Sequence, residues 1–314
     1  MSRILKKLTN LGEKLFFLLR SIYHKNISLK YILVLGFNYL TYRNFNKLLW
    51  KFKSLPKYDE EDITIIIGVK NRFDYRVVNA LRSIKNQRYS KNLIKTILVD
   101  YGSDNELISK LKKLCEEFDT EYVRVNNVPV WNRSHCLNIG IKKTSTKYVL
   151  VSDTDIIFKD NYISEAINEL KKNPYQVVVS EMIDLTKEAS KENINFETLN
   201  KARFKPRYFG TPHNSMPLTL TYFYYEINGF DEMYSVWGSE DNDLIKRFKY
   251  LGLNLKNICS KSVYFHQWHQ KYEGVRTGDY KKQIEKNLKY FENTNTIKRN
   301  KNGWGLINSK SQTT

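Results

Sequence analysis

Between residues 63 and 180, continuous apolar runs alternate with segments in which apolar residues recur at helical spacing. Ile63–Val69 is almost entirely apolar, as expected for a parallel strand buried on both faces, and Val77, Leu81 and Ile84 follow at helical spacing. The same alternation predicts further strands at 95–100, 121–126, 147–153 and 176–180, and helices at 107–118, 134–142 and 162–170. Strands that alternate with helices predict an α/β fold with a doubly wound, mostly parallel sheet. Ligand-binding loops of such a sheet follow the carboxyl ends of its strands, so we expect the chemistry there.

Beyond residue 183 the pattern becomes less regular. A polar stretch is followed by an aromatic one at 219–227, and a helix that ends at Gly252 is then marked by Leu244, Ile245, Phe248 and Leu251. A last strand is expected at 262–265. The segment 280–314 is rich in Lys and Asn, so we expect a basic polar tail that is mobile from residue 293 and carries little chemistry.

The first residues carry a separate apolar stripe. Apolar side chains recur with 4-3-4-3-4 spacing at Ile4, Leu8, Leu11, Leu15, Leu18 and Ile22. Most basic side chains of this stretch lie off the stripe, namely Lys6, Lys7, Lys14 and Arg20. The pattern predicts a basic amphipathic helix, which can lie on an anionic membrane with a gain of about 1 kcal/mol for each basic residue near the surface. The alternative is that the stripe packs on the core of the protein itself.

The positive charge of the chain is concentrated in the same segment. The formal net charge is +19, and residues 1–55 hold eleven Lys and Arg against one acid, Glu13, which gives +10 here and +9 for the other 259 residues. Such an excess favours anionic partners such as phosphates, nucleic acid or acidic lipids. Pro56 and the acidic run 59–62 then mark a change of composition, so we place a domain boundary near residue 58.

Several classes of protein are disfavoured by other features. The longest uncharged apolar run of the basic segment, Tyr31–Phe37, is far shorter than the roughly 20 residues of a membrane-spanning helix, and Leu15–Leu19 is too short for a secretory signal. Cys115, Cys136 and Cys259 form no CxxC pair, which argues against a disulfide framework and a cysteine zinc site. No nucleic-acid-binding signature is recognisable. We therefore expect a cytoplasmic protein at the inner face of the membrane that binds no nucleic acid.

Asp153-Thr154-Asp155 stands at the end of a predicted buried strand. Two carboxylates one residue apart at a strand end can hold a divalent ion together with a ribose or a diphosphate, because Mg²⁺ and Mn²⁺ accept oxygen ligands and leave positions open for phosphate. The alternative is an acidic pair in a solvated turn. The position at a strand end favours the ligand-binding interpretation.

A second acidic group, WGSEDNDL at 237–244, stands at the start of a predicted helix. Its acids are Glu240, Asp241 and Asp243. Acids in a first helical turn can simply offset the helix macrodipole, which contributes ~0.3–1 kcal/mol. The bulky Trp237 and the flexible Gly238 favour a shaped, mobile loop beside the acids over a simple cap.

The segment HQWH at 266–269 contributes two imidazoles. In an extended segment the offset of three residues would send His266 and His269 to opposite faces, so that one of them enters a site. In a helix they would share a face and could bind zinc, but no cysteine is close enough in sequence to complete a familiar motif. A structural role for a lone histidine is the remaining alternative.

Four segments, in this order, resemble a known family. ITIIIGVKNR, ILVDYGSDN and WNRSHCLNIGIKKTSTKYVLVSDTDIIF are similar to the donor half of family 2 nucleotide-sugar glycosyltransferases, which have the GT-A fold with a Rossmann-like sheet. INGFDEMYSVWGSEDNDLIKRFKYLG resembles the acceptor-side motif of β-1,4-galactosyltransferases, polypeptide N-acetylgalactosaminyltransferases and bacterial chondroitin-type polymerases. The resemblance covers about residues 63–270. It implies a donor half at 59–183 and an acceptor-binding, catalytic half at 184–279, flanked by the basic helical extension 1–58 and the tail 280–314.

The resemblance also implies roles on the donor side. The nucleotide would lie against the residues that follow the first strand, Lys70, Asn71 and Arg72. Asp100 would hydrogen-bond the nucleotide base, and Asp153 would face the ribose. The diphosphate and the donor sugar would contact Arg133 and Asn138, and the loop of Trp237 and Gly238 would border the donor. Tyr101 stands where the family commonly has Asp, which leaves the base preference open, although the family pattern leads us to expect uridine.

Metal binding and catalysis are implied in the same way. Asp155 would ligate Mn²⁺ or Mg²⁺ together with the diphosphate, and His266 would complete the coordination, with His269 as the alternative. Asp241, beside Glu240, would take the proton from the acceptor hydroxyl. A single base opposite the leaving group implies in-line attack with inversion.

The function implied is an inverting, metal-dependent glycosyltransferase. It would move a sugar from a nucleotide-sugar, expected to be a UDP-sugar, to a hydroxyl of a surface or capsular glycan or of a glycolipid. One alternative is a non-catalytic GT-A scaffold that binds sugar nucleotide, and the intact Asp153, Asp155 and Asp241 argue against it. The other is a basic protein that binds membrane or nucleic acid, which would not need acids at strand ends.

Overall fold

The computed structural model of the chain describes residues 43, 44, 46, 47, 49, 50, 53–126, 128, 130–191, 194–201, 213–270 and 278–307. The amphipathic helix predicted for residues 4–22 lies outside the described residues. Within the described ranges no helix is long and apolar enough to cross a membrane.

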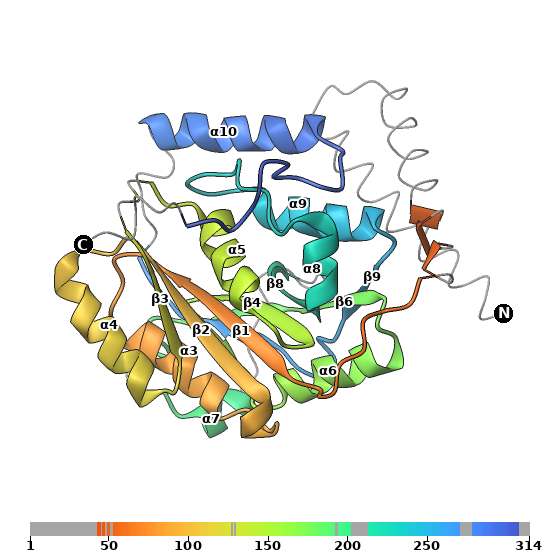
Figure 1. Cartoon of the computed structure of the whole chain (residues 1–314). Helices are drawn as coiled ribbons and strands as arrows, with labels where there is room; N and C mark the ends of the chain where they lie inside the picture. The colour runs from red at the N-terminus through yellow and green to blue at the C-terminus, as the bar shows by residue number, and fades with distance from the viewer. Residues whose placement is uncertain are drawn as a thin grey trace.

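A seven-stranded sheet forms the centre of the fold (Figure 1). The strand order is β3-β2-β1-β4-β8-β6-β9, with bounds β1 Ile63–Val69, β2 Ile94–Tyr101, β3 Glu121–Val125, β4 Tyr148–Asp153, β6 Gln176–Ser180, β8 His213–Leu220 and β9 Asn254–Asn257. Strand β8 runs antiparallel to its neighbours β4 and β6, and the other pairs are parallel. The α/β class and the mostly parallel sheet predicted from the sequence are thereby confirmed.

The central strands are mostly apolar because both faces of the sheet are covered. In β1 every residue except Gly68 is buried, and in β4 every residue except Asp153. Full burial of each Ile or Val contributes roughly 1.5–3 kcal/mol, which explains why these strands show continuous apolar runs and no alternation.

Helices α3 (Tyr75–Lys85) and α4 (Asn105–Glu117) lie on one face of the sheet, and α5 (Arg133–Lys143) lies on the other with α8 (Thr221–Ile227) and α9 (Glu240–Tyr250) (Figure 1). The connection from β3 to β4 has to cross back over β2 and β1, which puts α5 opposite α3. Gly140 allows α5 to approach β1 closely, since a Cβ there would lie 2.4 Å from Cγ2 of Ile66. Between residues 53 and 307, the described part of the chain also contains the helices α6 Tyr162–Lys172, α7 Phe196–Lys201 and α10 Gly278–Asn293 and the short 3₁₀ turn η1 Lys91–Leu93.

A second, three-stranded sheet lies beside the first. It consists of β5 (Ile156–Phe158), β10 (Tyr264–His266) and β7 (Met182–Asp184), with β10 in the middle. Its register places His266 opposite Ile156 on one side and Asp184 on the other. The small sheet therefore brings the histidine segment next to the Asp-x-Asp sequence that precedes β5.

Residues before the large sheet also pack on the domain. Trp50 is 6% exposed, its Nε1 donates to the carbonyl of Leu251 (2.7 Å), and its ring lies 5.4 Å from that of Phe223. Asn46 donates to the carbonyl of Tyr250 (2.6 Å). The end of the basic extension is therefore part of the packed structure, whereas the four predicted segment boundaries stay predictions.

The C-terminal segment differs from the mobile tail expected from its composition. Helix α10 is followed by residues that return to the domain, where Arg299 is 4% and Trp304 7% exposed. Arg299 pairs with Asp231 (3.0 Å) and Asp243 (3.3 Å). These partners lie more than 50 residues away in sequence, so the composition of the tail gave no sign of them.

Candidate active site

Charged side chains from several elements meet at the carboxyl ends of β1, β2 and β4. Parallel pairing places Gly68 of β1 beside Asp153 of β4, and Val69 beside Asp100 of β2. The acids that end these strands therefore lie along one edge of the sheet, where the chemistry was expected.

Arg133, the first residue of α5, connects two of the predicted site acids. Its Nε donates to Asp153 (2.6 Å), its Nη1 to Asp241 (2.7 Å), and its Nη2 to the carbonyl of Ser215 (3.0 Å). The side chain is 9% exposed, and burial alone would lower its pKa, but the two carboxylates raise the pKa well above its usual range. Arg133 is therefore a charged bridge between the end of β4 and the start of α9.

Asp241 lies in the first turn of α9. Burial raises the pKa of its carboxyl to about 7, Arg133 opposes this rise, and the charges of Glu240 and Asp153 add to it. A carboxyl that titrates near neutrality can accept a proton at physiological pH. Besides its place in the first turn of the helix, Asp241 thus makes an ion pair with the first residue of α5.

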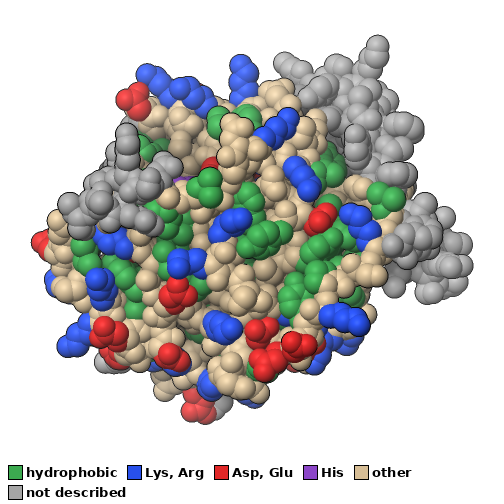
Figure 2. Space-filling model, in the orientation of Figure 1, with side chains coloured by type: hydrophobic (Ala, Val, Ile, Leu, Met, Phe, Trp, Pro, Cys, Tyr) green, Lys and Arg blue, Asp and Glu red, His purple; other side chains and the backbone are tan. Residues whose placement is uncertain are grey.

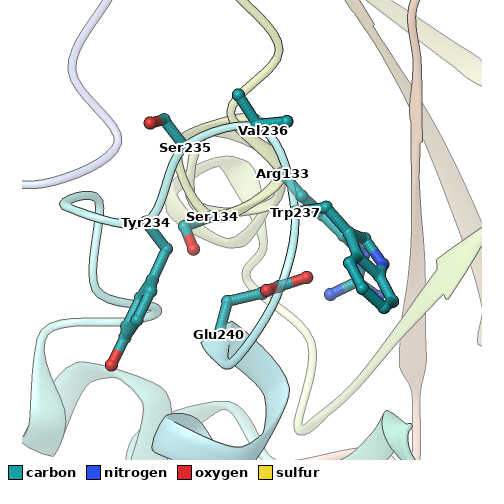
Figure 3. A pocket seen from close by; sticks show the side chains of 7 residues that line it. All are labelled: Arg133, Ser134, Tyr234, Ser235, Val236, Trp237 and Glu240. Atoms are coloured by element: carbon teal, nitrogen blue, oxygen red, sulfur yellow. The ribbon is translucent and has the colours of Figure 1, made fainter. Parts of the chain in front are cut away.

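Glu240 precedes it and points into the interior. It is 6% exposed, and its Oε2 has no hydrogen-bond partner among the described residues. Figure 3 shows this carboxylate beneath the loop that leads into α9, beside Arg133.

Asp155, His266 and His269 form a possible metal site. One ligand atom from each lies within 4.8 Å of the others. His266 Nε2 is 4.0 Å and His269 Nε2 3.7 Å from the Asp155 carboxylate, and the two rings lie 5.2 Å apart. Both histidines reach the site because β10 ends at His266, so the alternation expected for an extended segment does not apply.

Two further charged residues hold this cluster in place. Arg72 Nη1 donates to Asp155 (2.7 Å) and to Thr154 Oγ1 (3.0 Å). Asp184, at the end of β7, lies 3.0 Å from Nδ1 of His266. A carboxylate at Nδ1 turns Nε2 toward Asp155 and fixes the tautomer that can bind a metal.

Three other residues that were predicted to contact the nucleotide-sugar form hydrogen bonds within the protein. Asp100 is fully buried and accepts from the Ser103 amide (2.8 Å), the Tyr122 hydroxyl (2.6 Å) and Arg124 (2.6 Å). Lys70 Nζ donates to the carbonyls of Tyr101, Gly102 and Val128 (3.2, 3.0 and 2.6 Å). Asn138 is fully buried. Its side-chain Nδ2 donates to the carbonyl of Phe230 and to the Glu232 carboxylate, and its Oδ1 accepts from the backbone amide of Phe230.

These hydrogen bonds show that Asp100, Lys70 and Asn138 stabilise the structure. That they also contact a nucleotide-sugar stays a prediction. Asn71 joins the first two strand ends, because its backbone amide donates to Ser103 Oγ (2.9 Å) and its side-chain Oδ1 accepts from the backbone amide of Asp104 (2.7 Å). Of the donor-side residues, the structure brings Arg72, Arg133, Asp153 and Asp155 together at the site.

The loop before α9 arches over the start of α5 (Figure 3). Val236 donates from its amide to the carbonyl of Trp131 (2.9 Å), and Trp237 is 61% exposed. Val236, Gly238 and Ser239 have left-handed backbone angles, with φ of 66°, 105° and 75°. A β-branched residue rarely adopts this conformation, so the loop is strained at Val236 as well as shaped by Gly238.

Sequence reasoning missed Asp184 and the backbone carbonyl of Ser215. Asp184 ends an apolar stretch, MID at 182–184, as Asp153 ends β4. Its position at the end of an apolar stretch could have identified Asp184 as a candidate site residue. The Ser215 carbonyl is a backbone group, which no side-chain pattern reveals.

Two family models match the chain. The model of glycosyl transferase family 2 matches residues 64–227, and a model described as the N-terminal domain of galactosyltransferase matches residues 218–270. Because the first match covers more than half of the chain, the chain belongs to glycosyl transferase family 2. The second match contains Asp241 and both histidines of the metal cluster.

Similar solved structures confirm the GT-A fold. TarS of S. aureus has a TM-score of 0.53 at 14% identity, over 75% of this chain and 40% of TarS. TarS 1–349 in complex with UDP-GlcNAc gives 0.53 at 15% identity, over 75% of this chain and 68% of that one. GalNAc-T7 with UDP, GalNAc and Mn²⁺ gives 0.52 at 14% identity, over 73% of this chain and 50% of that one.

One curated relative matches a shorter stretch. An uncharacterized glycosyltransferase of Rickettsia bellii (strain RML369-C) is 28% identical over 115 residues. The match spans 36% of this chain and 16% of that relative. The chain thus covers only a small part of that relative and less than half of the full TarS chain.

Proposed function

We propose that the protein transfers a sugar from a UDP-sugar to a hydroxyl acceptor, with inversion at the anomeric carbon. The observation that carries the proposal is the bridge from Arg133 to Asp153 and Asp241. It joins an acid at the end of a central strand to a carboxyl whose pKa is raised toward neutrality. A sugar donor at Asp153 and an acceptor at Asp241 would therefore lie next to each other, on either side of the Arg133 guanidinium.

The cluster of Asp155, His266 and His269 fits a divalent ion at the donor side. Its one carboxylate and two imidazoles favour Mn²⁺ over Mg²⁺, which takes oxygen ligands almost exclusively. When bound, the ion would neutralise charge that develops on the β-phosphate of the leaving nucleotide. Arg72, in contact with Asp155, adds a fixed positive charge beside the same position.

The chain's own acid–base chemistry lies on the acceptor side. Asp241 in its carboxylate form would accept the acceptor's hydroxyl proton as the new bond to the anomeric carbon forms. The bond from that carbon to the diphosphate breaks on the opposite face, so the configuration inverts. A positioned carboxylate typically contributes 10²–10⁴-fold to such a step.

The choice of a uridine nucleotide is supported by the two similar structures. TarS is described in complex with UDP-GlcNAc and GalNAc-T7 in complex with UDP, GalNAc and Mn²⁺. Both share the GT-A fold with this chain, and the second contains the kind of ion that suits the Asp-His-His cluster.

The acceptor and the location belong to the same proposal. The basic amphipathic stripe of residues 4–22 supports peripheral attachment to the inner face of an anionic membrane, where a surface glycan or glycolipid would be the acceptor. On the face in Figure 2, Lys and Arg side chains are spread out among acidic ones, so no single patch gathers the charge there. The N-terminal segment is the proposed attachment site because residues 1–55 hold eleven Lys and Arg against one acid.

A panel of UDP-sugars and other nucleotide-sugars, with and without Mn²⁺, tests this function. We expect calorimetric binding and slow hydrolysis of at least one UDP-sugar, dependent on Mn²⁺ and abolished by EDTA. Binding with no hydrolysis and no transfer to any added glycan would favour the non-catalytic scaffold. No binding of any nucleotide-sugar would reject the proposal.

A further inference from the structure

Helix α10 lies outside both segments that match the family models, since these end at residues 227 and 270. It runs along the top of the molecule in Figure 1, near the loop that leads into α9. Most of its side chains are exposed, and Asn287 is its one buried residue at 3% exposure. A buried amide on an otherwise exposed helix calls for a specific partner, because burial of an unbonded polar group is costly.

Those partners are the backbone carbonyls of the loop before α9. Asn287 Nδ2 donates to the carbonyl of Ser235 (2.9 Å) and to that of Trp237 (3.1 Å). Its Oδ1 accepts from Nε2 of Gln283 (3.0 Å), one turn earlier on α10. The two hydrogens of the side-chain amide therefore bind the carbonyls of the residues before and after Val236. The bond from Gln283 sets the orientation of this amide.

The loop needs such support because its backbone is strained. Val236 at φ 66° and Ser239 at φ 75° have left-handed conformations that non-glycine residues rarely adopt and that persist only where surrounding contacts impose them. Three kinds of hydrogen bond do so at Val236: the bond from its amide to the Trp131 carbonyl, the bond from the Trp237 amide to the Ser235 carbonyl (2.9 Å), and the two bonds from Asn287. Ser239 is the residue directly before Glu240 and Asp241, so relaxation of the loop would move the start of α9.

Asn287 is not what attaches α10 to the domain. The Tyr290 hydroxyl donates to Asp231 (2.9 Å), and Lys246 of α9 donates to the carbonyls of Phe291 (3.1 Å) and Thr294 (3.0 Å) at the end of the helix. These bonds would keep α10 in place without Asn287. The effect of losing Asn287 should therefore fall on the loop.

We infer that Asn287 is a positioning residue for the transfer reaction proposed above, and this role rests on that proposed function. It holds the loop of residues 235–239 in the strained shape that presents Asp241 to Arg133 and Asp153. It acts through its hydrogen bonds to the carbonyls of Ser235 and Trp237. The C-terminal helix is thereby a part of the catalytic unit that the family models do not include.

The test uses the full chain with Asn287→Asp, which keeps the shape and replaces the donating nitrogen with an oxygen that faces two carbonyls. Lys286→Ala, an exposed change on the same helix, is the matched control. Gln283→Ala is a milder variant in case Asn287→Asp fails to fold. Three quantities are measured: kcat with the UDP-sugar found in the panel, the Kd of UDP with Mn²⁺, and amide hydrogen exchange of residues 234–241.

We expect kcat to fall on the order of tenfold in Asn287→Asp, as for the loss of two hydrogen bonds, and about two- to threefold in Gln283→Ala. The Kd of UDP should stay within about twofold, and exchange should rise in the loop and the first turn of α9 alone. Lys286→Ala should match the wild type. Unchanged kcat and loop exchange in a folded Asn287→Asp, or a rise in exchange across the whole domain, would overturn the inference.

The activity of the wild type separates a failure of the proposed function from a failure of this inference. If the wild type turns over no nucleotide-sugar, the proposed function fails, and the role of Asn287 in reaction fails with it. If the wild type is active and the variants keep both its kcat and its exchange pattern, only the role of Asn287 fails.

Discussion

Asp241→Asn should remove most of the transfer activity and leave the fold and the donor affinity nearly unchanged. An amide keeps the shape of the side chain and can still accept from Arg133, which also retains Asp153 and the Ser215 carbonyl as partners. No buried charge is left unpaired, so a large loss of stability is not expected. The amide cannot take a proton, so kcat should fall by ~10²–10⁴, which corresponds to about 2.7–5.4 kcal/mol of barrier.

The pKa of Asp241 gives the same prediction a pH dependence. Because burial raises this pKa to about 7, roughly half of the carboxyl is ionised at pH 7 and roughly a tenth at pH 6. The active form is the deprotonated one, so kcat/KM should rise about tenfold per pH unit below 7 and level off above it. Glu240→Gln removes a neighbouring negative charge that helps raise this pKa, so it should shift the rise to lower pH.

The assay is release of UDP from the selected donor, measured from pH 5 to pH 9 on preparations checked for folding by circular dichroism. Asp160→Asn serves as matched control, since Asp160 also pairs with an arginine, Arg88, but makes none of the contacts of the site. Turnover of Asp241→Asn above a tenth of the wild type, or an unchanged rise around pH 7 in that variant, would refute the role of Asp241 as base.

Three further expectations concern the metal and the membrane. Asp155→Ala should abolish Mn²⁺-dependent UDP binding in calorimetry, with smaller losses for His266→Ala and smallest for His269→Ala; normal affinity in Asp155→Ala would remove the metal assignment. Asp184→Ala should weaken binding of Mn²⁺ alone about 10–100-fold, because His266 loses its Nδ1 partner, and electron paramagnetic resonance of free Mn²⁺ measures this. Deletion of residues 1–42, which spares the buried Trp50, should stop sedimentation with anionic vesicles while UDP binding persists; unchanged sedimentation would reject membrane attachment by this segment.

The strands and helices of the donor half were predictable because their physical cause is local. A strand covered on both faces must be apolar throughout, so β1 was predicted with the bounds that the structure has, and β2, β3, β4 and β6 within a residue or so. Strands β8 and β9 were not predicted. The first follows an irregular polar stretch, and the second is a polar edge strand whose residues are all partly exposed.

The residue types of the site were also visible in the sequence, and so was their place at strand and helix ends. Asp153, Asp155 and Asp241 were identified in this way, and the order of the motifs indicated the family. Which of their atoms meet was not visible. Arg133 reaches Asp241 over 108 residues of sequence, and spacing along the chain carries no information about such a contact.

The sequence by itself thus determined the α/β class, the buried strands and the chemistry available at their ends, because these depend on short-range periodicity and on residue type. Only the tertiary structure decided that the polar atoms of Asp100, Lys70 and Asn138 hydrogen-bond to strand β3 and neighbouring loops. It also decided that both histidines face Asp155, and that Asn287 of the supposed tail supports the loop before α9. Each of these depends on pairing between distant segments, where the partner of a polar group is set by the packing of the whole chain.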